Sequence, residues 1–439
     1  MKQEPFLSLI DQVQADLPGQ GIVWADQLRR LASAQFSSDG FPSPREEEWR
    51  YTNIAPIEKH QFSLPAGGPG QVDPTLVDGA RLEGCDQWVF VDGRYDAELS
   101  SVDRLPEGAT VMSIRQAFQD EERLVQSWLG QAIGKDSHGF IHFNTASFSD
   151  GMLVHLAPKV RLTRPVQLLF VASEQEAATL FSVRNVIVAE SGSMGHVIET
   201  HIGPEGACYL SNSVSELFVA NNAHLRHSRF QNESQSAHHM GGLYVQLQEH
   251  GQLSQDNFSF GAALSRCEVH AELGTAADCR LNGLYIGQGR QHMDHHTRLN
   301  HNKPHAVSKE FYKGIMAERA RGVFQGRIIV AEGAMKTDAD MGNRNLLLSD
   351  RAEVDSKPQL EIYADDVKCA HGVTIGQLDE ESIFYLRSRA VDEETARNML
   401  TFAFANEMVE RIEFEPLRMQ VLDAVLDRFP QRGMRREWL

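Results

Sequence analysis

Residues 160–173, VRLTRPVQLLFVAS, show the pattern that dominates the middle of this 439-residue chain. Apolar and polar residues alternate there over short runs, with hardly any helical period. Similar runs recur in GHVIETHIG (195–203) and SELFVANNAHLRHSRF (215–230), separated by small and polar turns. Alternation with a period of two is typical of β-strands. We therefore expect the chain to be mainly β, with nearly all of its middle formed by short strands.

The strand region also contains weak internal repeats. IVAESGSM (187–194) resembles IVAEGAM (329–335), and turns at 222–225, 250–253 and 277–279 recur at about the interval of one solenoid rung. Stacked rungs would form a parallel β-helix, in which each strand pairs with the rungs above and below and free edges remain only at the two ends. A β-sandwich stays open as an alternative, because it also gives short alternating strands.

Helical patterns flank this region on both sides. Apolar residues recur at helical spacing near the N-terminus and again after Asp379, after Asp392 and from Glu415 onward. Aspartate directly before such a segment can accept hydrogen bonds from free backbone amides and cap the helix. We expect an N-terminal helical region, a mixed α/β lead-in, a parallel β-helix core and a C-terminal helical domain, at residues 1–90, 91–158, 159–377 and 378–439.

The composition favours a protein of the reducing cytoplasm that binds neither nucleic acid nor membrane. Sixty acidic and 42 basic side chains give a formal net charge of −18, which repels phosphate backbones and anionic lipid surfaces. No segment has the run of about 18 apolar residues that a membrane helix needs. The five cysteines share no CxxC spacing, which argues against a disulfide framework and against a self-contained zinc site.

The motifs of common enzymes are absent. The sequence has no GxxxxGK(S/T) phosphate loop, no GxSxG nucleophile turn and no GxGxxG between a strand and a helix. We therefore expect no catalytic residues, and any hydrolysis of ATP would be the work of another protein. A β-helix enzyme that acts on polysaccharide remains an alternative, although the charged side chains are too scattered to line a groove.

A histidine-rich segment at 292–305, HMDHHTRLNHNKPH, is the most conspicuous candidate metal site. On a strand, His292, Asp294 and His296 would lie on one face, and imidazole with carboxylate suits zinc, iron or manganese. The string DHH is similar to a motif of manganese phosphoesterases, but the chain lacks the βα alternation of those enzymes. The other interpretation is structural, with the histidines forming stacked polar rungs and turn hydrogen bonds.

Cysteine and histidine come together once, in KCAHGVTIGQLDEE (368–381). In an extended stretch Cys369 and His371 point to one side, and thiolate and imidazole are ligands that iron and copper accept. Asp365 and Asp366 just before them add oxygen donors. A closed metal site takes about four ligands, so these residues would form an open half-site completed by another chain. The alternative is an ordinary turn before a helix.

The C-terminal helices carry more aromatic residues than one buried stripe needs. Phe384, Tyr385, Phe402 and Phe404 all fall within these helices. The surplus predicts an aromatic surface for a partner. A small self-contained helical bundle is the alternative.

Long strings of this chain resemble the SufB/SufD family of the SUF system of iron-sulfur cluster assembly. They are HMDHHTRLNHNKPHAVSKEFYKGIMAERARGVFQGRIIV (292–330), LLLSDRAEVDSKPQLEIYADDVKCAHG (346–372) and TIGQLDEESIFYLRSRAVDEETARNMLTFAFANEMVERI (374–412). KCAHG followed by TIGQLDEE and FYLRSR is similar to the SufD branch of the family, as is PREEEWRYTN at 44–53. Without the resemblance, this charged run is equally well interpreted as a solvated helix face.

The resemblance implies a non-catalytic scaffold built on a right-handed parallel β-helix. It implies pairing with SufB through the β-helix and binding of the ATPase SufC through the C-terminal helices; the isolated chain would be a monomer or a weak homodimer. His371 matches the family's functional histidine and Cys369 the cysteine beside it, so the two would hold transient iron or a nascent cluster shared with SufB. No tightly bound cofactor is expected. The expected partner-binding residues are Phe384, Tyr385, Arg387, Arg389, Phe402 and Phe404.

Overall fold

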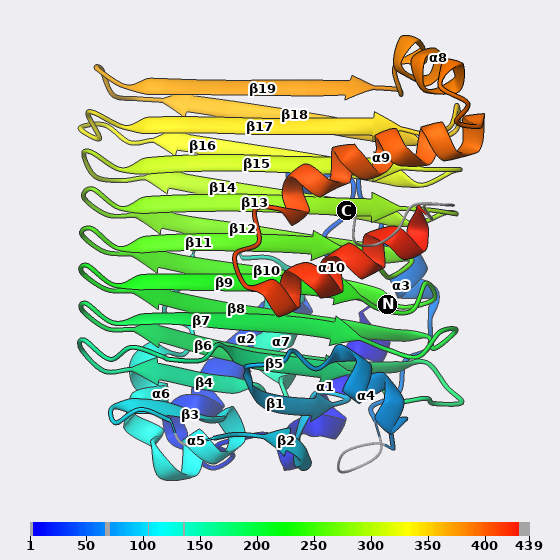
Figure 1. The fold of residues 1–439 in the computed structure, drawn as a ribbon. Helices are drawn as coiled ribbons and strands as arrows, with labels where there is room; N and C mark the ends of the chain where they lie inside the picture. Colours follow the sequence, from blue (N-terminus) through cyan, green and yellow to red (C-terminus); the bar gives the residue numbers. More distant parts are fainter. Residues whose placement is uncertain (1–2, 66–70, 104, 135–136, 430–439) are drawn as a thin grey trace.

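The strands of this chain stack into two sheets that face each other. The computed structural model describes residues 3–65, 71–103, 105–134 and 137–429. Through most of the chain each strand pairs in parallel with the strand two positions further along, so consecutive strands alternate between the sheets. One strand from each sheet makes a rung, and the rungs rise in chain order (Figure 1). This is the expected parallel β-helix, and the parallel pairing excludes the sandwich alternative.

Each sheet has its own set of strands. The front sheet, which faces the viewer in Figure 1, contains in spatial order β19 (Lys368–Gly376), β17 (Asp338–Leu347), β15 (Val307–Met316), β13 (Asp278–Gly287), β11 (Gln252–Ser259), β9 (His224–Asn232), β7 (Met194–Ile202), β5 (Val166–Val171), β1 (Asp86–Val91) and β2 (Arg94–Ser101). The back sheet contains β18 (Glu353–Ile362), β16 (Arg321–Val330), β14 (His292–His301), β12 (Leu264–Leu273), β10 (His238–Leu247), β8 (Tyr209–Val219), β6 (Thr179–Ala189), β4 (Met152–Leu156) and β3 (Ala109–Ser113).

Helices cover the outer faces of both sheets. The back sheet packs against α1 (Glu4–Val13), α2 (Val23–Asp39), α3 (Ala55–Lys59), α5 (Ile114–Asp120), α6 (Glu122–Trp128), α7 (Gly139–Ser147) and the short 3-10 helix η2 (Glu47–Trp49), with η1 (Gln14–Asp16) following α1. The front sheet packs against α4 (Pro74–Ala80), α9 (Glu393–Val409) and α10 (Glu415–Arg428). The remaining helix, α8 (Glu380–Ser388), lies beyond the end of β19 (Figure 1).

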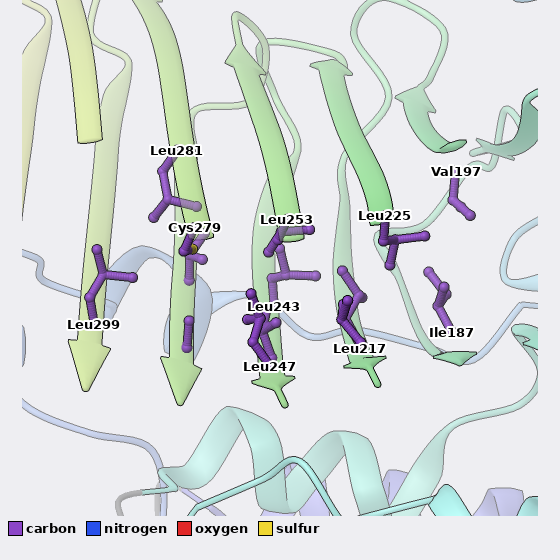
Figure 2. Close-up of a cluster of buried hydrophobic side chains, with 14 of the residues drawn as sticks. Ile187, Val197, Leu217, Leu225, Leu243, Leu247, Leu253, Cys279, Leu281 and Leu299 are labelled. Carbon is purple, nitrogen blue, oxygen red and sulfur yellow. The ribbon is translucent and has the colours of Figure 1, made fainter. Parts of the chain in front are cut away.

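The interior of the β-helix is filled by side chains that point inward from both sheets. Leu225, Leu253 and Cys279 are in register on successive strands of the front sheet, and all three are buried. They belong to one cluster with Leu217 and Leu243 of the back sheet (Figure 2). Each fully buried leucine side chain stabilises the fold by about 2 kcal/mol. The inward half of each alternating strand thus supplies the core that its pattern predicts.

Part of this interior is polar. Glu199 is fully buried, and its carboxylate accepts a hydrogen bond from Arg229 (Nη2 to Oε2, 2.9 Å) and lies 3.1 Å from His227 Nε2. Burial alone would raise the pKa of Glu199, but Arg229 and His227 outweigh it and hold that pKa well below its ordinary value. The network therefore keeps a charged carboxylate inside the stack, bonded to groups from neighbouring rungs.

The two ends of the β-helix differ. The antiparallel pairs β1–β2 and β3–β4 terminate the stack at its N-terminal end. At the other end, within the described residues, β19 pairs with β17 alone and β18 with β16 alone. Val354, Leu360, Ala364 and Val367 pack there against the interior core but remain only partly buried. We call β18, β19 and the turn between them the open end.

The C-terminal helices begin where the sequence predicts. The Asp379 carboxylate accepts hydrogen bonds from the amides of Glu381 and Ser382, and Asp392 accepts one from Thr395. The third helix begins at Glu415, also as expected. In the described ranges no helix combines the length and the apolar character that crossing a membrane requires. The division of the chain into four regions stays a prediction.

The buried carboxyl group of Glu310 on β15 gives the first testable prediction. Burial raises its pKa from 4.5 to about 7, although the Thr297 hydroxyl lowers it in part. The folded state therefore binds this proton more tightly than the unfolded chain does, and the resulting loss of stability accumulates as pH rises from about 4.5 to about 7. Glu310→Gln cannot ionise, so its free energy of unfolding should exceed that of the wild type by about 3 kcal/mol near pH 8.

Denaturant unfolding at several pH values measures this difference. It should shrink to nothing below about pH 4.5, since the wild-type group is then protonated in both states. The exposed Glu205 is the matched control, and Glu205→Gln should change the free energy of unfolding little near pH 8. A Glu310→Gln protein that is no more stable than the wild type near pH 8 would contradict the assignment.

Candidate functional site

Cys369 and His371 are two residues apart on the same strand at the open end. They are on β19, opposite Ala339 and Met341 of β17, whose side chains are buried in the interior core. Since alternate residues of a strand point to the same face, the two side chains share one face, as the sequence predicted. The register with Ala339 and Met341 shows that this face is the interior one. Cys369 is half-buried against the core, whereas His371 is exposed. The pair thus sits on the last rung, next to the interior but accessible from outside.

The same pair does not form a complete metal site. Burial raises the pKa of the Cys369 thiol, with a further rise from Asp338, so the thiol is protonated until a metal or another cation displaces the proton. Asp366, in the turn before β19, forms an ion pair with Lys336, in the turn before β17. Across the described residues, no group of three or more His, Cys, Asp or Glu side chains is arranged to hold a metal ion. Cys369 and His371 therefore offer at most part of a coordination shell.

The histidine-rich segment forms β14 and is divided between two environments. His292, Asp294 and His296 share one face of the strand, as the sequence predicts. It is the outer face, since Met293 and Leu299 point into the interior core. Asp294 is fully buried there and accepts hydrogen bonds from Arg266 (Nη1 to Oδ2, 2.5 Å) and Thr52.

His295 points inward from the same strand. It stacks on Tyr285 with ring centroids 4.6 Å apart, and its Nε2 lies 3.1 Å from Ser259 Oγ. Because these side chains bind each other and the neighbouring rungs, the structure favours the structural interpretation over a metal or phosphoesterase site.

Residues 44–53, the PREEEWRYTN segment, form what we call the strap. It is not a solvated helix: one 3-10 turn, η2, places Trp49 in the core, and only 3% of Trp49 is exposed. The Arg266 guanidinium lies 3.7 Å from the centroid of the Trp49 ring, and Glu48 contacts His296 and Arg327. Both the strap and the histidine-rich segment stand out in the sequence, but the contact between them does not. The one signal was a tryptophan and a threonine within a run of charged residues.

The C-terminal aromatic residues separate into exposed and buried sets. On α8, Phe384 is 75% exposed and Tyr385 57% exposed, and the Arg389 guanidinium lies 5.2 Å from the centroid of the Tyr385 ring. Phe402 of α9, by contrast, is 6% exposed and belongs to the cluster that joins α9 and α10 to the front sheet.

The remaining predicted residues lie between these extremes. Phe404 is partly buried against the same cluster, with Lys313 Nζ 4.2 Å from its ring centroid, and Arg387 is exposed and pairs with Glu393 at 3.2 Å. Phe402, predicted to bind a partner, is therefore part of the core. On the surface of α8 and at its end lie Phe384, Tyr385, Arg387 and Arg389.

Known proteins resemble this chain over almost its whole length. Residues 1–168 match the SufBD protein N-terminal region, and residues 170–404 match the SufBD core domain of the SUF system of FeS cluster assembly. The iron-sulfur cluster assembly protein SufD of Escherichia coli is 35% identical over 90% of this chain and 91% of its own length. A SufBD family protein of Synechocystis is 30% identical over 90% and 89%, and SufD of Bacillus subtilis 24% identical over 92% and 93%.

The two family matches cover consecutive parts of the chain, and the E. coli relative aligns with 90% of it. The chain therefore belongs to the SufB/SufD family of iron-sulfur cluster assembly proteins.

Proposed function

We propose that this chain is a scaffold subunit that pairs at its open end with the second β-helix subunit, SufB, and binds the ATPase SufC through α8. The observation that carries the proposal is the open end itself. Among the described residues, β18 and β19 each have a partner strand on one side only, and the apolar residues beneath are only partly buried. A second chain with two free parallel edges can continue both ladders and cover this surface.

The same surface suits chemistry that two chains share. Cys369 and His371 face the interior on the last rung, so a chain docked at the open end would bring its own side chains next to them. Iron accepts thiolate and imidazole ligands, and a closed site takes about four. In this proposal iron or a nascent cluster is cargo, held briefly by Cys369 and His371 together with ligands from SufB. The chain contributes to iron acquisition without turning over a substrate alone.

The ATPase would bind the exposed face of α8. Phe384 and Tyr385 present aromatic surface there, and Arg387 and Arg389 add two cations at the helix end, where cations also interact favourably with the helix dipole. α8 follows β19 directly, so force applied to α8 would reach the open end through a short connection (Figure 1). All five cysteines are unpaired, which fits a reducing cytoplasm.

The metal role of His371 gives a direct prediction. His371→Ala should lower the yield of clusters assembled by the reconstituted complex by about tenfold or more, because one ligand of the shared site is lost. Its thermal stability should stay unchanged, since the side chain is exposed in the free chain. Pairing with SufB should persist, because in the proposal the two strand edges provide the main contact. Cluster absorbance of the reconstituted complex measures the yield.

Lys368→Ala is the control, because Lys368 is exposed on the same strand but aligns with Asp338 on the outer face. It should leave the cluster yield near that of the wild type. An unaltered yield in the His371→Ala complex would remove the half-site from the proposal.

The role of α8 is tested separately by Phe384→Ala. Truncating a central aromatic contact should weaken binding of the ATPase by about tenfold or more, without unfolding the chain. Leu31 of α2 is 64% exposed, so Leu31→Ala removes a comparable apolar surface far from α8 and should leave binding intact. Calorimetric titration of each variant with the ATPase measures the effect. Equal affinities of the wild type and both variants for the ATPase would mean that the ATPase does not bind at Phe384 of α8.

A further inference from the structure

The strap contacts the outer face of four neighbouring strands of the back sheet. Trp49 lies over Arg266 of β12, Glu48 contacts β14 and β16, and Glu47 contacts β18. Glu268, His296, Gln325 and Lys357 are register partners on β12, β14, β16 and β18, and all four point to the outer face. The strap runs along this line of register partners toward the open end. Its charged residues therefore reach β18, the last strand of the back sheet. The proposed function leaves their role unexplained.

The strap is anchored over β12 and β14. Trp49 and Thr52 are buried, with 3% and 1% of their surface exposed. The Trp49 ring covers Arg266, and the Thr52 hydroxyl donates to Asp294 Oδ2 at 2.5 Å and lies 3.0 Å from His292 Nε2. These contacts fix the strap on rungs that are already paired on both sides.

From this anchor the strap extends to the strands nearest the open end. Glu48 accepts hydrogen bonds from Gln325 (2.9 Å) and Arg327 (3.3 Å) of β16, and Arg327 also pairs with Glu361 of β18 at 2.5 Å. Glu47 accepts one from Lys357 of β18 at 2.5 Å. Two adjacent glutamates thus tie both β16 and the terminal strand β18 to the anchored segment.

We propose that the strap holds β16 and β18 in the geometry that a second β-helix chain needs for docking, with Glu48 as the main positioning residue. An edge strand has one neighbour and opens more readily than a central strand. If β18 were free to fray, binding a partner would require ordering it first, and the affinity would fall accordingly. Because the strap already orders β18 in the free chain, binding no longer includes this cost. This inference rests on the proposed pairing at the open end.

The first test compares Glu48→Gln with Glu46→Gln in the full-length chain. Glu48→Gln should weaken binding of SufB about tenfold and speed amide hydrogen exchange in β16 and β18, because the charged contact to Arg327 is lost. The Glu46 carboxylate accepts a hydrogen bond from the amide of Ser43, just before the strap, so Glu46→Gln removes the same charge without touching the sheet and should bind like the wild type. Exchange in the buried strands β8 and β10 should be equal in all three proteins, which a general loss of stability would not allow.

Exchanging the charges of Glu47 and Lys357 tests the contact to β18, because the double variant keeps one acidic and one basic side chain at this position. Glu47→Lys and Lys357→Glu should each weaken SufB binding about threefold, since like charges then meet across an exposed contact. The double variant should restore both the affinity and the slow exchange of β18. This arm remains decisive if Glu48→Gln fails to fold.

The outcomes separate the two proposals. Wild-type protein that does not bind SufB at all would overturn the proposed function. Wild-type binding with equal affinities for Glu48→Gln and Glu46→Gln, or a charge-exchanged double variant no better than its single variants, would overturn the role of the strap alone.

Discussion

The fold depends on one constraint: a parallel ladder satisfies the backbone only where each strand has a neighbour on both sides. Every buried N–H and C=O group needs a partner, and inside the stack each rung supplies it to the next. The last rung has no such neighbour within the described part of the chain. Proteins usually protect such edges with short strands, charges or a covering element. Here the edge strand β18 is as long as β16, with 10 residues each, and β19 has 9 residues against 10 in β17. The apolar residues next to these edge strands are only partly buried.

The buried charges in the interior also restrict how the strands can pair. Breaking a buried ion pair leaves an unpaired charge and costs several kcal/mol, so a network such as that of Glu199, Arg229 and His227 tolerates few arrangements of the rungs. Shifting a strand by one residue would turn all of its inward side chains outward. Apolar contacts alone discriminate weakly between registers when many inward residues are leucine or valine. We infer that the polar interior fixes the register that the apolar stack stabilises.

What the sequence could reveal follows from the range of each interaction. Alternation identifies a strand because neighbours in sequence decide which face is buried, and Asp379 and Asp392 identify helix starts because a cap bonds to amides a few residues away. The surplus of aromatic residues in the C-terminal helices predicts a surface role for Phe402, but Phe402 is buried because the front sheet, distant in sequence, packs against its side of α9.

Contacts between distant segments carried no such local signal. The stacking of Trp49 on Arg266 joins residues far apart in the chain, so neither the strap nor β14 could be explained alone. The half-site was different, since the spacing of Cys369 and His371 predicted a shared face that the register with Ala339 and Met341 confirms. Both side chains lie on β19, which has a partner on one side only within the described residues. In the proposed pairing, a chain that docks at this edge would supply the missing backbone partners and would also bring its side chains next to the thiol and the imidazole. Under that proposal, one contact would complete both the sheet and the coordination of the metal.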